Sequence, residues 1–391
     1  MLIILFYYIL FQILLTRQRQ YIALTHLIIL IEVSMSLNCG IVGLPNVGKS
    51  TIFKALTNHH AVIENYPFST IEPNIARLNV HDKRLVQISQ ITKSKQIIPA
   101  SVEFIDIAGL VKGASKGEGL GNQFLGHIRQ VNAIFHVIRC FDDVNITHVH
   151  ETLDPIRDIE IVELELILAD LEVIEKKLKN LQNAHKCSDK ESTRKNQQNL
   201  VVLEQLKKKL CDSNLELAWI NEVSNCDMIR ELNLISLKPR IYVCNIDDSQ
   251  ISKDCAEKVS IWAQNKKSKS LNINGFQAVQ CHSLHFNEKS DNACEQLIKE
   301  SYRLLDLITF FTKNKNEVRA WEIKKGTSAQ KAAGKIHSDM ERGFIRAEII
   351  SSHDLVQLLS EEKVREAGKV RIEGKNYQIQ DGDIMNVRFN I

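Results

Sequence analysis

The segment Gly43–Ser50 reads GLPNVGKS and matches the G-x-x-x-x-G-K-S pattern of a phosphate-binding loop. It follows the apolar run Asn38–Val42, which we expect to form a short buried strand, and it precedes Thr51–Leu56, which we expect to begin a helix. In this arrangement backbone N–H groups and the helix N-terminus point toward the phosphates of a nucleotide. The pattern and its flanks therefore predict a nucleoside triphosphate site.

The side chains around this loop indicate a magnesium site beside the triphosphate. Lys49 can reach the β- and γ-phosphates, and the Ser50 hydroxyl can coordinate Mg²⁺. A second acidic group is expected on a neighbouring strand, and Asp106 supplies it near the end of the apolar run Val102–Ile107. Thr70 lies between the two motifs in the sequence, and we predict that its hydroxyl is a further Mg²⁺ ligand.

The loop that follows Asp106 indicates a switch with unusual hydrolytic chemistry. Asp106 begins a D-x-x-G motif, in which the Gly109 amide can sense the γ-phosphate. Leu110 comes next, where GTPases of the Ras type have a glutamine that orients the attacking water. Leucine cannot do this, so hydrolysis is slow, uses another group or awaits a partner. His148 and His127 are candidates to orient water, and ordinary surface or core histidines are the alternative.

The residues that follow the strand expected at Arg240–Asn245 bear on the choice of base. GTPases have Asn-Lys-x-Asp at this place, with the Asp pairing to guanine, whereas this chain has Asn245, Ile246, Asp247 and Asp248. The Lys is replaced and the Asp is kept. The motif alone leaves the choice between adenine and guanine open.

Composition excludes several other functional classes. The 391 residues include 50 Lys+Arg and 47 Asp+Glu, so no overall charge attracts nucleic acid, although a local patch can. The nine cysteines contain no C-x-x-C pair, which argues against a zinc cluster or a disulfide framework and favours reduced thiols in the cytoplasm. The hydrophobic content of 44% suffices for two or three domain cores.

Residues 1–34 differ from the rest of the chain. Leu2–Leu15 and Tyr21–Val33 are apolar runs, each too short to cross a bilayer of roughly 30 Å as a helix. A membrane-anchoring hairpin is one interpretation. We favour the alternative that Met35 is the true start and that the leader is not part of the native protein, so we expect no membrane association.

From Met35 onward, strand-like runs alternate with helical stretches, which predicts a mostly parallel α/β sheet. The expected strands are Asn38–Val42, Val102–Ile107, Ala133–Arg139, Arg240–Asn245 and Gln277–Cys281. Between the third and the fourth, leucines and isoleucines from Leu164 to Leu181 recur at spacings of three and four, and a second helical pattern carries Leu203, Leu206 and Leu210. We interpret this region as a helical hairpin inserted into the nucleotide domain.

The chain beyond about Asp306 reads as a small β-rich module with one main helix at Ser328–His337, which suggests a β-grasp fold. Strands are expected at Glu317–Ile323, Ile345–Ile350 and Ile384–Phe389. Between Lys313 and Arg346 there are nine Lys/Arg and four Asp/Glu. This excess could meet RNA phosphates, and a solvated face is an equal alternative.

These motifs together resemble the Obg-like ATPase family, also called YchF, in the translation-factor class of P-loop NTPases. The resemblance runs from Met35 to Ile391. Its matching stretches are Gly40–Lys54, Asn65–Asn74, Asp106–Phe124, Arg139–Phe141, Ala332–His337, Glu341–Glu348 and Gln380–Asp383.

The resemblance implies a domain order and a function. The nucleotide domain would comprise residues 35–158 and 215–305, an inserted coiled-coil-like helical domain residues 159–214, and a C-terminal TGS domain residues 306–391. Family members hydrolyse ATP in preference to GTP and associate with ribosomes. The resemblance therefore implies a cytoplasmic, Mg²⁺-dependent ATPase that acts as a ribosome-associated switch, with a TGS domain that could contact RNA.

The resemblance also carries residue roles onto this chain. It implies that the phosphates are held by Asn46, Val47, Gly48, Lys49, Ser50 and Thr51. Ser50 and Thr70 would hold Mg²⁺, Asn245 and Ile246 would lie against the base, and the histidine implicated in hydrolysis would be His148. The chain departs from the family where Asp248 replaces the usual Glu of the base motif.

Two alternatives to the ATPase remain at this point. Asp248 favours a GTPase of the same architecture, because Asp is the residue that guanine recognition normally uses, whereas Ile246 disfavours it. Leu110 is compatible with a nucleotide-sensing module that binds RNA or the ribosome and hydrolyses almost nothing.

Overall fold

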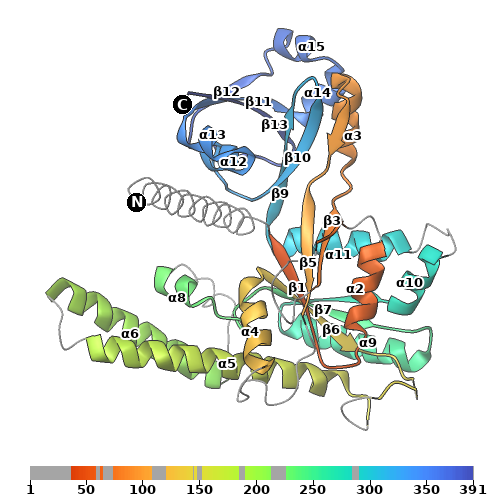
Figure 1. The fold of residues 1–391 in the computed structure, drawn as a ribbon, viewed down its shortest axis with the longest axis vertical. Coiled ribbons are helices and arrows are strands. Elements are labelled where there is room, and N and C mark those ends of the chain that lie inside the picture. The colour runs from red at the N-terminus through yellow and green to blue at the C-terminus, as the bar shows by residue number, and fades with distance from the viewer. Residues whose placement is uncertain are drawn as a thin grey trace, which may run out of the picture. The chain divides into compact units, whose positions relative to one another are not determined.

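The structure is a computed structural model that describes residues 37–58, 62–64, 74–107, 120–143, 145–147, 152–184, 190–212, 226–283 and 290–390 (Figure 1). Residues 1–34, the segment predicted to be foreign to the native protein, lie outside these ranges. No helix within the described ranges is long and apolar enough to cross a membrane.

The first sheet contains four of the five strands predicted for the nucleotide domain. Its order is β2-β3-β5-β1-β6-β7-β8. The strands are β1 (Asn38–Val42), β2 (Val62–Glu64), β3 (Asn74–Asn79), β5 (Ser101–Asp106), β6 (Ala133–Arg139), β7 (Arg240–Asn245) and β8 (Lys269–Ile273). The pairs from β5 through β8 are parallel, whereas β3 runs antiparallel to β2 and β5. The mostly parallel sheet is therefore confirmed.

The central strands are apolar because both of their faces are covered, as parallel sheets require. Every residue of β6 is buried, and only the first residue of β1 is partly exposed. The helices of this domain are α2 (Lys49–Asn58), α4 (Leu120–Gln130), α9 (Gln250–Asn265), α10 (Gly275–Ser283) and α11 (Ser290–Leu304).

One predicted strand, Gln277–Cys281, is wrong. These residues lie in α10, and the strand of this region is β8, which ends before them. The Asn274 side chain accepts a hydrogen bond from the Gln277 N–H at 3.0 Å and so caps the start of a helix. Phe276 is 66% exposed, so the apolar residues here do not mark a buried strand.

The inserted helical hairpin is present as α5 (Pro155–Ala184) and α6 (Lys190–Cys211), which pack against each other. The predicted stripe forms a core that includes Ile174, Leu178, Leu203, Leu206 and Leu210, together with the short helix α8 (Asp227–Leu232). The first turns of α5 instead pack on the nucleotide domain, where Ile159 joins Tyr242 and Cys244.

The second sheet forms the C-terminal module and has the order β12-β11-β13-β9-β10-β4. Its C-terminal strands are β9 (Leu307–Lys313), β10 (Glu317–Lys324), β11 (Phe344–Ser351), β12 (Arg371–Glu373) and β13 (Asp383–Phe389). The helices of the module are α12 (Ala329–Ile336), α13 (Ser338–Arg342), α14 (Ser352–Leu358) and α15 (Glu361–Glu366). The main helix and the three strands predicted from the sequence are all confirmed.

A segment from the first third of the chain completes this module. The strand β4 (Gln96–Ile98) pairs in parallel with β10, and α3 (Lys83–Thr92) lies against α14 and β10 (Figure 1, orange among blue). Leu85 and Ile88 of α3 are buried with Phe311 and Val318 in one core. The segment from Lys83 to Ile98 therefore packs with the C-terminal module, with β4 in its sheet and α3 in its core. The domain division predicted from the sequence had assigned this segment to the nucleotide domain.

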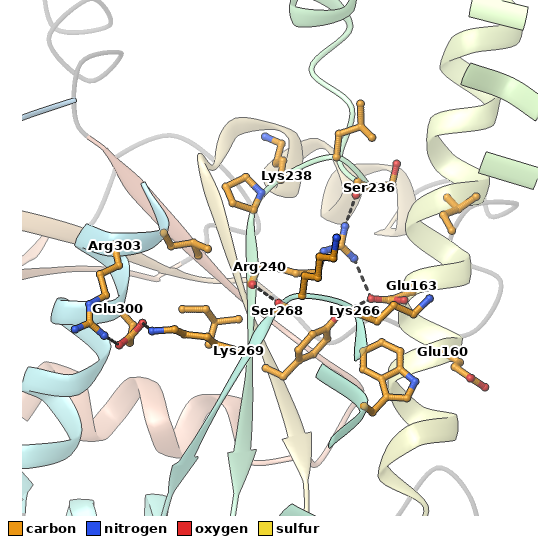
Figure 2. Close-up of a pocket in the computed structure, with 18 of the residues that line it drawn as sticks. Glu160, Glu163, Ser236, Lys238, Arg240, Lys266, Ser268, Lys269, Glu300 and Arg303 are labelled. Atoms are coloured by element: carbon orange, nitrogen blue, oxygen red, sulfur yellow. Dashed lines mark hydrogen bonds and ion pairs between the residues drawn. The ribbon is translucent and has the colours of Figure 1, made fainter. Parts of the chain in front are cut away.

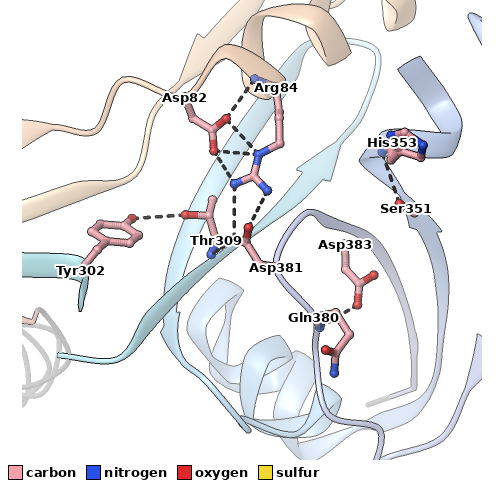
Figure 3. Close-up of polar contacts among 9 residues, drawn as sticks. All are labelled: Asp82, Arg84, Tyr302, Thr309, Ser351, His353, Gln380, Asp381 and Asp383. Atoms are coloured by element: carbon pink, nitrogen blue, oxygen red, sulfur yellow. Dashed lines mark hydrogen bonds and ion pairs between the residues drawn. The ribbon is translucent and has the colours of Figure 1, made fainter. Parts of the chain in front are cut away.

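Polar contacts reinforce this junction (Figure 3). Arg84 donates to Asp82 through Nη2 at 2.7 Å and to Asp381 through Nη1 at 2.7 Å. Asp381 also accepts from the Thr309 N–H at 2.9 Å, so the turn before β13 is tied to both α3 and β9.

Candidate nucleotide-binding site

The phosphate loop lies between β1 and α2, at the carboxyl end of a central strand of the first sheet. Helix α2 starts directly after it, and the Ile52 N–H donates to the Gly48 carbonyl at 3.0 Å. Gly48 has a φ of +92°, and a Cβ there would collide with the side-chain amide of Asn245. Only glycine fits this position, because the backbone is in the left-handed region and the neighbouring amide is too close.

Lys49 is held inside the curve of this loop. Its side chain is buried, and its Nζ donates to the Leu44 carbonyl at 2.7 Å. Burial lowers the pKa of Lys49 to about 8, and the nearby Asp106 carboxylate partly offsets that effect. Phosphate oxygens beside Nζ would favour the charged form further, so the site suits a polyanionic ligand.

The structure brings the predicted metal ligands Ser50 and Asp106 together. The Ser50 hydroxyl lies 3.4 Å from Oδ2 of Asp106, although the two residues are 56 positions apart in the sequence. Burial raises the pKa of Asp106, while Lys49 and the Ser50 hydroxyl act in the opposite direction. A hydroxyl and a carboxylate at the mouth of a phosphate loop are oxygen ligands of the kind that Mg²⁺ prefers, so the described residues fit this ion.

Asn245 organises the side of the site where the base is expected. It is buried at the end of β7, where its Nδ2 donates to the Val47 carbonyl at 3.1 Å and its Oδ1 accepts from the Gly275 N–H at 3.1 Å. One carboxamide therefore links the phosphate loop to the start of α10. The structure thus places Asn245 beside the phosphate loop, and its contact with the base stays a prediction.

The two other residues of the base motif lie in different surroundings. The Ile246 N–H donates to the Ile273 carbonyl at 2.9 Å, and its half-buried side chain packs against the core beneath β7. Asp248 is exposed, and its Oδ2 accepts from the Gln277 side chain at 2.7 Å. The carboxylate that could recognise guanine is therefore already hydrogen-bonded to α10.

A loop after β6 forms a further wall of the site that our reasoning from residue chemistry missed. Arg139 is buried and donates to the carbonyls of Phe141, Asp143 and Ile146 at 2.9 to 3.1 Å. Asn46, in the left-handed conformation at φ 60°, donates through Nδ2 to the Thr147 carbonyl at 3.1 Å. The sequence signal for this loop was Arg139, a charged residue at the end of the mostly apolar strand β6.

Several predicted site residues lie outside the described residues, namely Thr70, Gly109, Leu110 and His148. Thr51 is half-buried in the first turn of α2, next to Ser50. His127, the other histidine considered for orienting water, lies in the last turn of α4 and is half-buried. Within the described ranges no group of three His, Cys, Asp or Glu residues could hold a metal ion.

A parallel sheet with this loop at the end of a central strand, a buried loop lysine and a Ser–Asp pair beside it defines a P-loop nucleoside triphosphatase. Comparisons with known proteins agree. A model described as 50S ribosome-binding GTPase matches residues 38–203, and the YchF-GTPase C-terminal model, described as a protein of unknown function, matches residues 307–390.

Relatives that align over their whole length identify the family within the P-loop nucleoside triphosphatases. The chain is 45% identical over 370 residues to the ribosome-binding ATPase YchF of Buchnera aphidicola subsp. Schizaphis graminum and 42% identical over 370 residues to that of Bacillus subtilis, in each case over 91% of this chain and 100% of the relative. The solved structure of the Schizosaccharomyces pombe YchF GTPase superposes with a TM-score of 0.76 at 34% identity, over 90% of this chain and 98% of that one. The chain belongs to the YchF family.

Proposed function

We propose that this protein is a Mg²⁺-dependent ATPase that hydrolyses ATP to ADP and phosphate and acts as a nucleotide switch on the ribosome. The bacterial relatives are named ribosome-binding ATPases, which supports both the substrate and the partner. The observation that carries the hydrolytic part is the buried Lys49 within the loop, next to the Ser50–Asp106 pair.

The chemistry would be in-line attack of water on the γ-phosphorus, with release of ADP as the leaving group. Lys49 and the loop N–H groups would stabilise the charge that develops on the phosphoryl oxygens. Ser50, Asp106 and Thr70 would hold Mg²⁺, which when bound neutralises charge on the β- and γ-phosphates. His148 remains our candidate for orienting the water, and the Gly109 amide our candidate sensor of the γ-phosphate.

Ribosome association extends the proposal to the whole chain. We propose a nucleotide domain (35–158 and 215–305, apart from Lys83–Ile98, which packs with the second sheet), a helical domain (159–214) and a TGS domain (306–391). We also propose that the TGS domain can contact RNA. Since ribosomes are its proposed partner, we propose that the protein acts in the cytoplasm and expect no membrane association.

The substitution Lys49→Ala tests the site. Phosphate release from ATP should fall by at least about a hundredfold, because no ammonium group would stabilise the negative charge that develops on the phosphoryl oxygens in the transition state. Lys54→Ala is the matched control, since Lys54 lies on the same helix and is exposed. Unchanged turnover in Lys49→Ala would remove this loop from the reaction.

A GTPase of the same architecture is the second candidate, favoured by Asp248 and by the name of the solved relative, a YchF GTPase. Calorimetric titration with ATP and with GTP, each with Mg²⁺, separates the two. A clear preference for ATP supports the first proposal, and equal or tighter GTP binding replaces it with the second.

A further inference from the structure

A cavity of about 670 Å³ lies at the edge of the first sheet opposite the phosphate loop (Figure 2). Strands β7 and β8 run parallel to β1 and β6, and the residues that line the cavity include Arg240 and Lys269, the first residues of β7 and β8. The phosphate loop follows the carboxyl end of β1. The cavity therefore lies at the amino ends of the parallel strands, and the phosphate loop lies at their carboxyl ends. The nucleotide chemistry therefore does not account for this cavity.

One wall of the cavity is a face of α5. The lining residues Glu160, Glu163, Leu164 and Ile167 have the spacing that places side chains on one side of a helix. Leu164 is 55% exposed and Ile167 is partly exposed. The aromatic rings of Tyr242 and Trp262 also line the cavity, with their centroids 5.1 Å apart. This side of the cavity offers apolar surface to a partner.

The lining as a whole is basic. The lining contains six lysines and arginines and three glutamates, which gives the cavity a net charge of +3. Lys269 and Arg303 share the single carboxylate of Glu300, at 3.1 and 2.6 Å, so one positive charge of this trio is not neutralised. Arg240 pairs with Glu163 at 3.3 Å, and the charges of these two residues balance.

Lys266 and Lys267 supply further exposed positive charge. Both are exposed at the turn between α9 and β8, and Lys266 Nζ lies 5.6 Å from the centroid of the Trp262 ring. The ion pairs found across the described ranges involve neither lysine. The cavity thus combines exposed lysines with exposed aliphatic surface.

The contacts within the cavity argue against a small ligand with specific polar recognition. Tyr242 donates its hydroxyl hydrogen to Glu163 at 2.6 Å, and Ser268 donates to the Arg240 carbonyl at 2.9 Å. Arg240 itself is engaged by Glu163 and the Ser236 carbonyl. The inner polar groups are therefore satisfied by the protein, and the attraction that remains comes from the lysines at the rim and the apolar wall.

An RNA backbone would match the lysines but would leave Leu164 and Ile167 against phosphates and water. A polypeptide segment that carries both carboxylates and aliphatic side chains matches the lysines and the apolar residues of the lining. We propose that this cavity binds an acidic, amphipathic segment of a ribosomal protein. The inference rests on the proposed ribosome association and adds the surface and the kind of partner.

The experiment uses the full chain and purified ribosomes. A photoreactive p-benzoylphenylalanine replaces Leu164, the complex is irradiated and sedimented, and the cross-linked component is identified by mass spectrometry and primer extension. In parallel, sedimentation measures the ribosome affinity of the double variant Lys266→Glu and Lys267→Glu. The matched control is Lys253→Glu with Lys258→Glu, on exposed positions of α9 that do not line the cavity.

The expected result is a cross-link to an acidic segment of a ribosomal protein, and an affinity about tenfold lower for the cavity variant than for the control. A cross-link to ribosomal RNA overturns the inference in favour of nucleic-acid binding. Ribosome binding without a cross-link at Leu164, or equal weakening by both variants, also overturns it while leaving the proposed function intact. Failure of the wild-type chain to sediment with ribosomes refutes the proposed function, and the inference falls with it.

Discussion

Replacing Ile88 with alanine should destabilise the C-terminal sheet and leave the nucleotide-binding sheet folded. Ile88 is fully buried on α3 and packs in the same core as Phe311, Val318 and Ile384 of the second sheet. The sequence position of residue 88, between two nucleotide-site motifs, suggests the opposite. The prediction therefore tests whether α3 is stabilised by packing on the C-terminal module or on the nucleotide domain.

The magnitude follows from the burial of this side chain. Alanine removes three carbon atoms, each worth about 0.8 kcal/mol on burial, and the residual cavity adds to that loss. Together they give a cost of about 3 kcal/mol, within the range measured for Ile-to-Ala changes in other cores. Such a loss should increase local opening of the module by more than about a hundredfold.

Hydrogen exchange with mass spectrometry is the assay, because it reports protection separately for each sheet. Peptides covering β10 and β11 should exchange faster in Ile88→Ala, whereas peptides covering β1 and β6 should match the wild type. The control Ile138→Ala, at an equally buried position in the nucleotide domain, should give the reverse pattern. Loss of protection in β1 and β6 with β10 unchanged in Ile88→Ala would refute the assignment of α3 to the second module.

Three further predictions concern charged and titratable groups. A double-mutant cycle between Arg84→Ala and Asp381→Asn, read from urea denaturation, should give a coupling energy of about 1 kcal/mol, because the pair is close but partly exposed. Burial lowers the pKa of His136 to about 3 from its ordinary 6.5. The unfolded chain therefore binds the extra proton first, and stability should fall by about 1.4 kcal/mol per pH unit as the pH drops from 6.5 toward 3. His136→Phe should flatten that slope. Asp248→Asn should change the KM for ATP by no more than about twofold, because the carboxylate is exposed and bonded to Gln277.

Each of these has a contrary outcome. Additive effects of Arg84→Ala and Asp381→Asn would mean that the contact does not hold α3 to the turn before β13. An unchanged acid slope in His136→Phe would assign the pH dependence to other groups. A tenfold rise in the KM for ATP in Asp248→Asn would place that carboxylate on the base.

The local motifs could be predicted from the sequence, because they depend on residues that are close together in the chain. The GLPNVGKS loop required a strand before it and a helix after it, and β1 and α2 occupy those positions. Strands β1, β6 and β7 were predicted at their observed bounds, since continuous apolar runs of that length are typical of buried parallel strands. The helical hairpin followed from the periodicity of its leucines and isoleucines.

Long-range packing decided what the motifs could not. No local pattern indicates that Leu85 and Ile88 are buried against Phe311, more than two hundred residues away, because an amphipathic helix shows which face is apolar and not what covers it. The predicted strand Gln277–Cys281 is wrong for a related reason, since the cap from Asn274 outweighs a short apolar run. The approach of Ser50 to Asp106 and the bridge that Asn245 makes between the phosphate loop and α10 likewise exist only once the parallel strands are in register. The sequence by itself thus predicted the phosphate-binding residues from a local motif, and the tertiary structure decided which distant side chains meet them, because those contacts depend on the packing of separate strands.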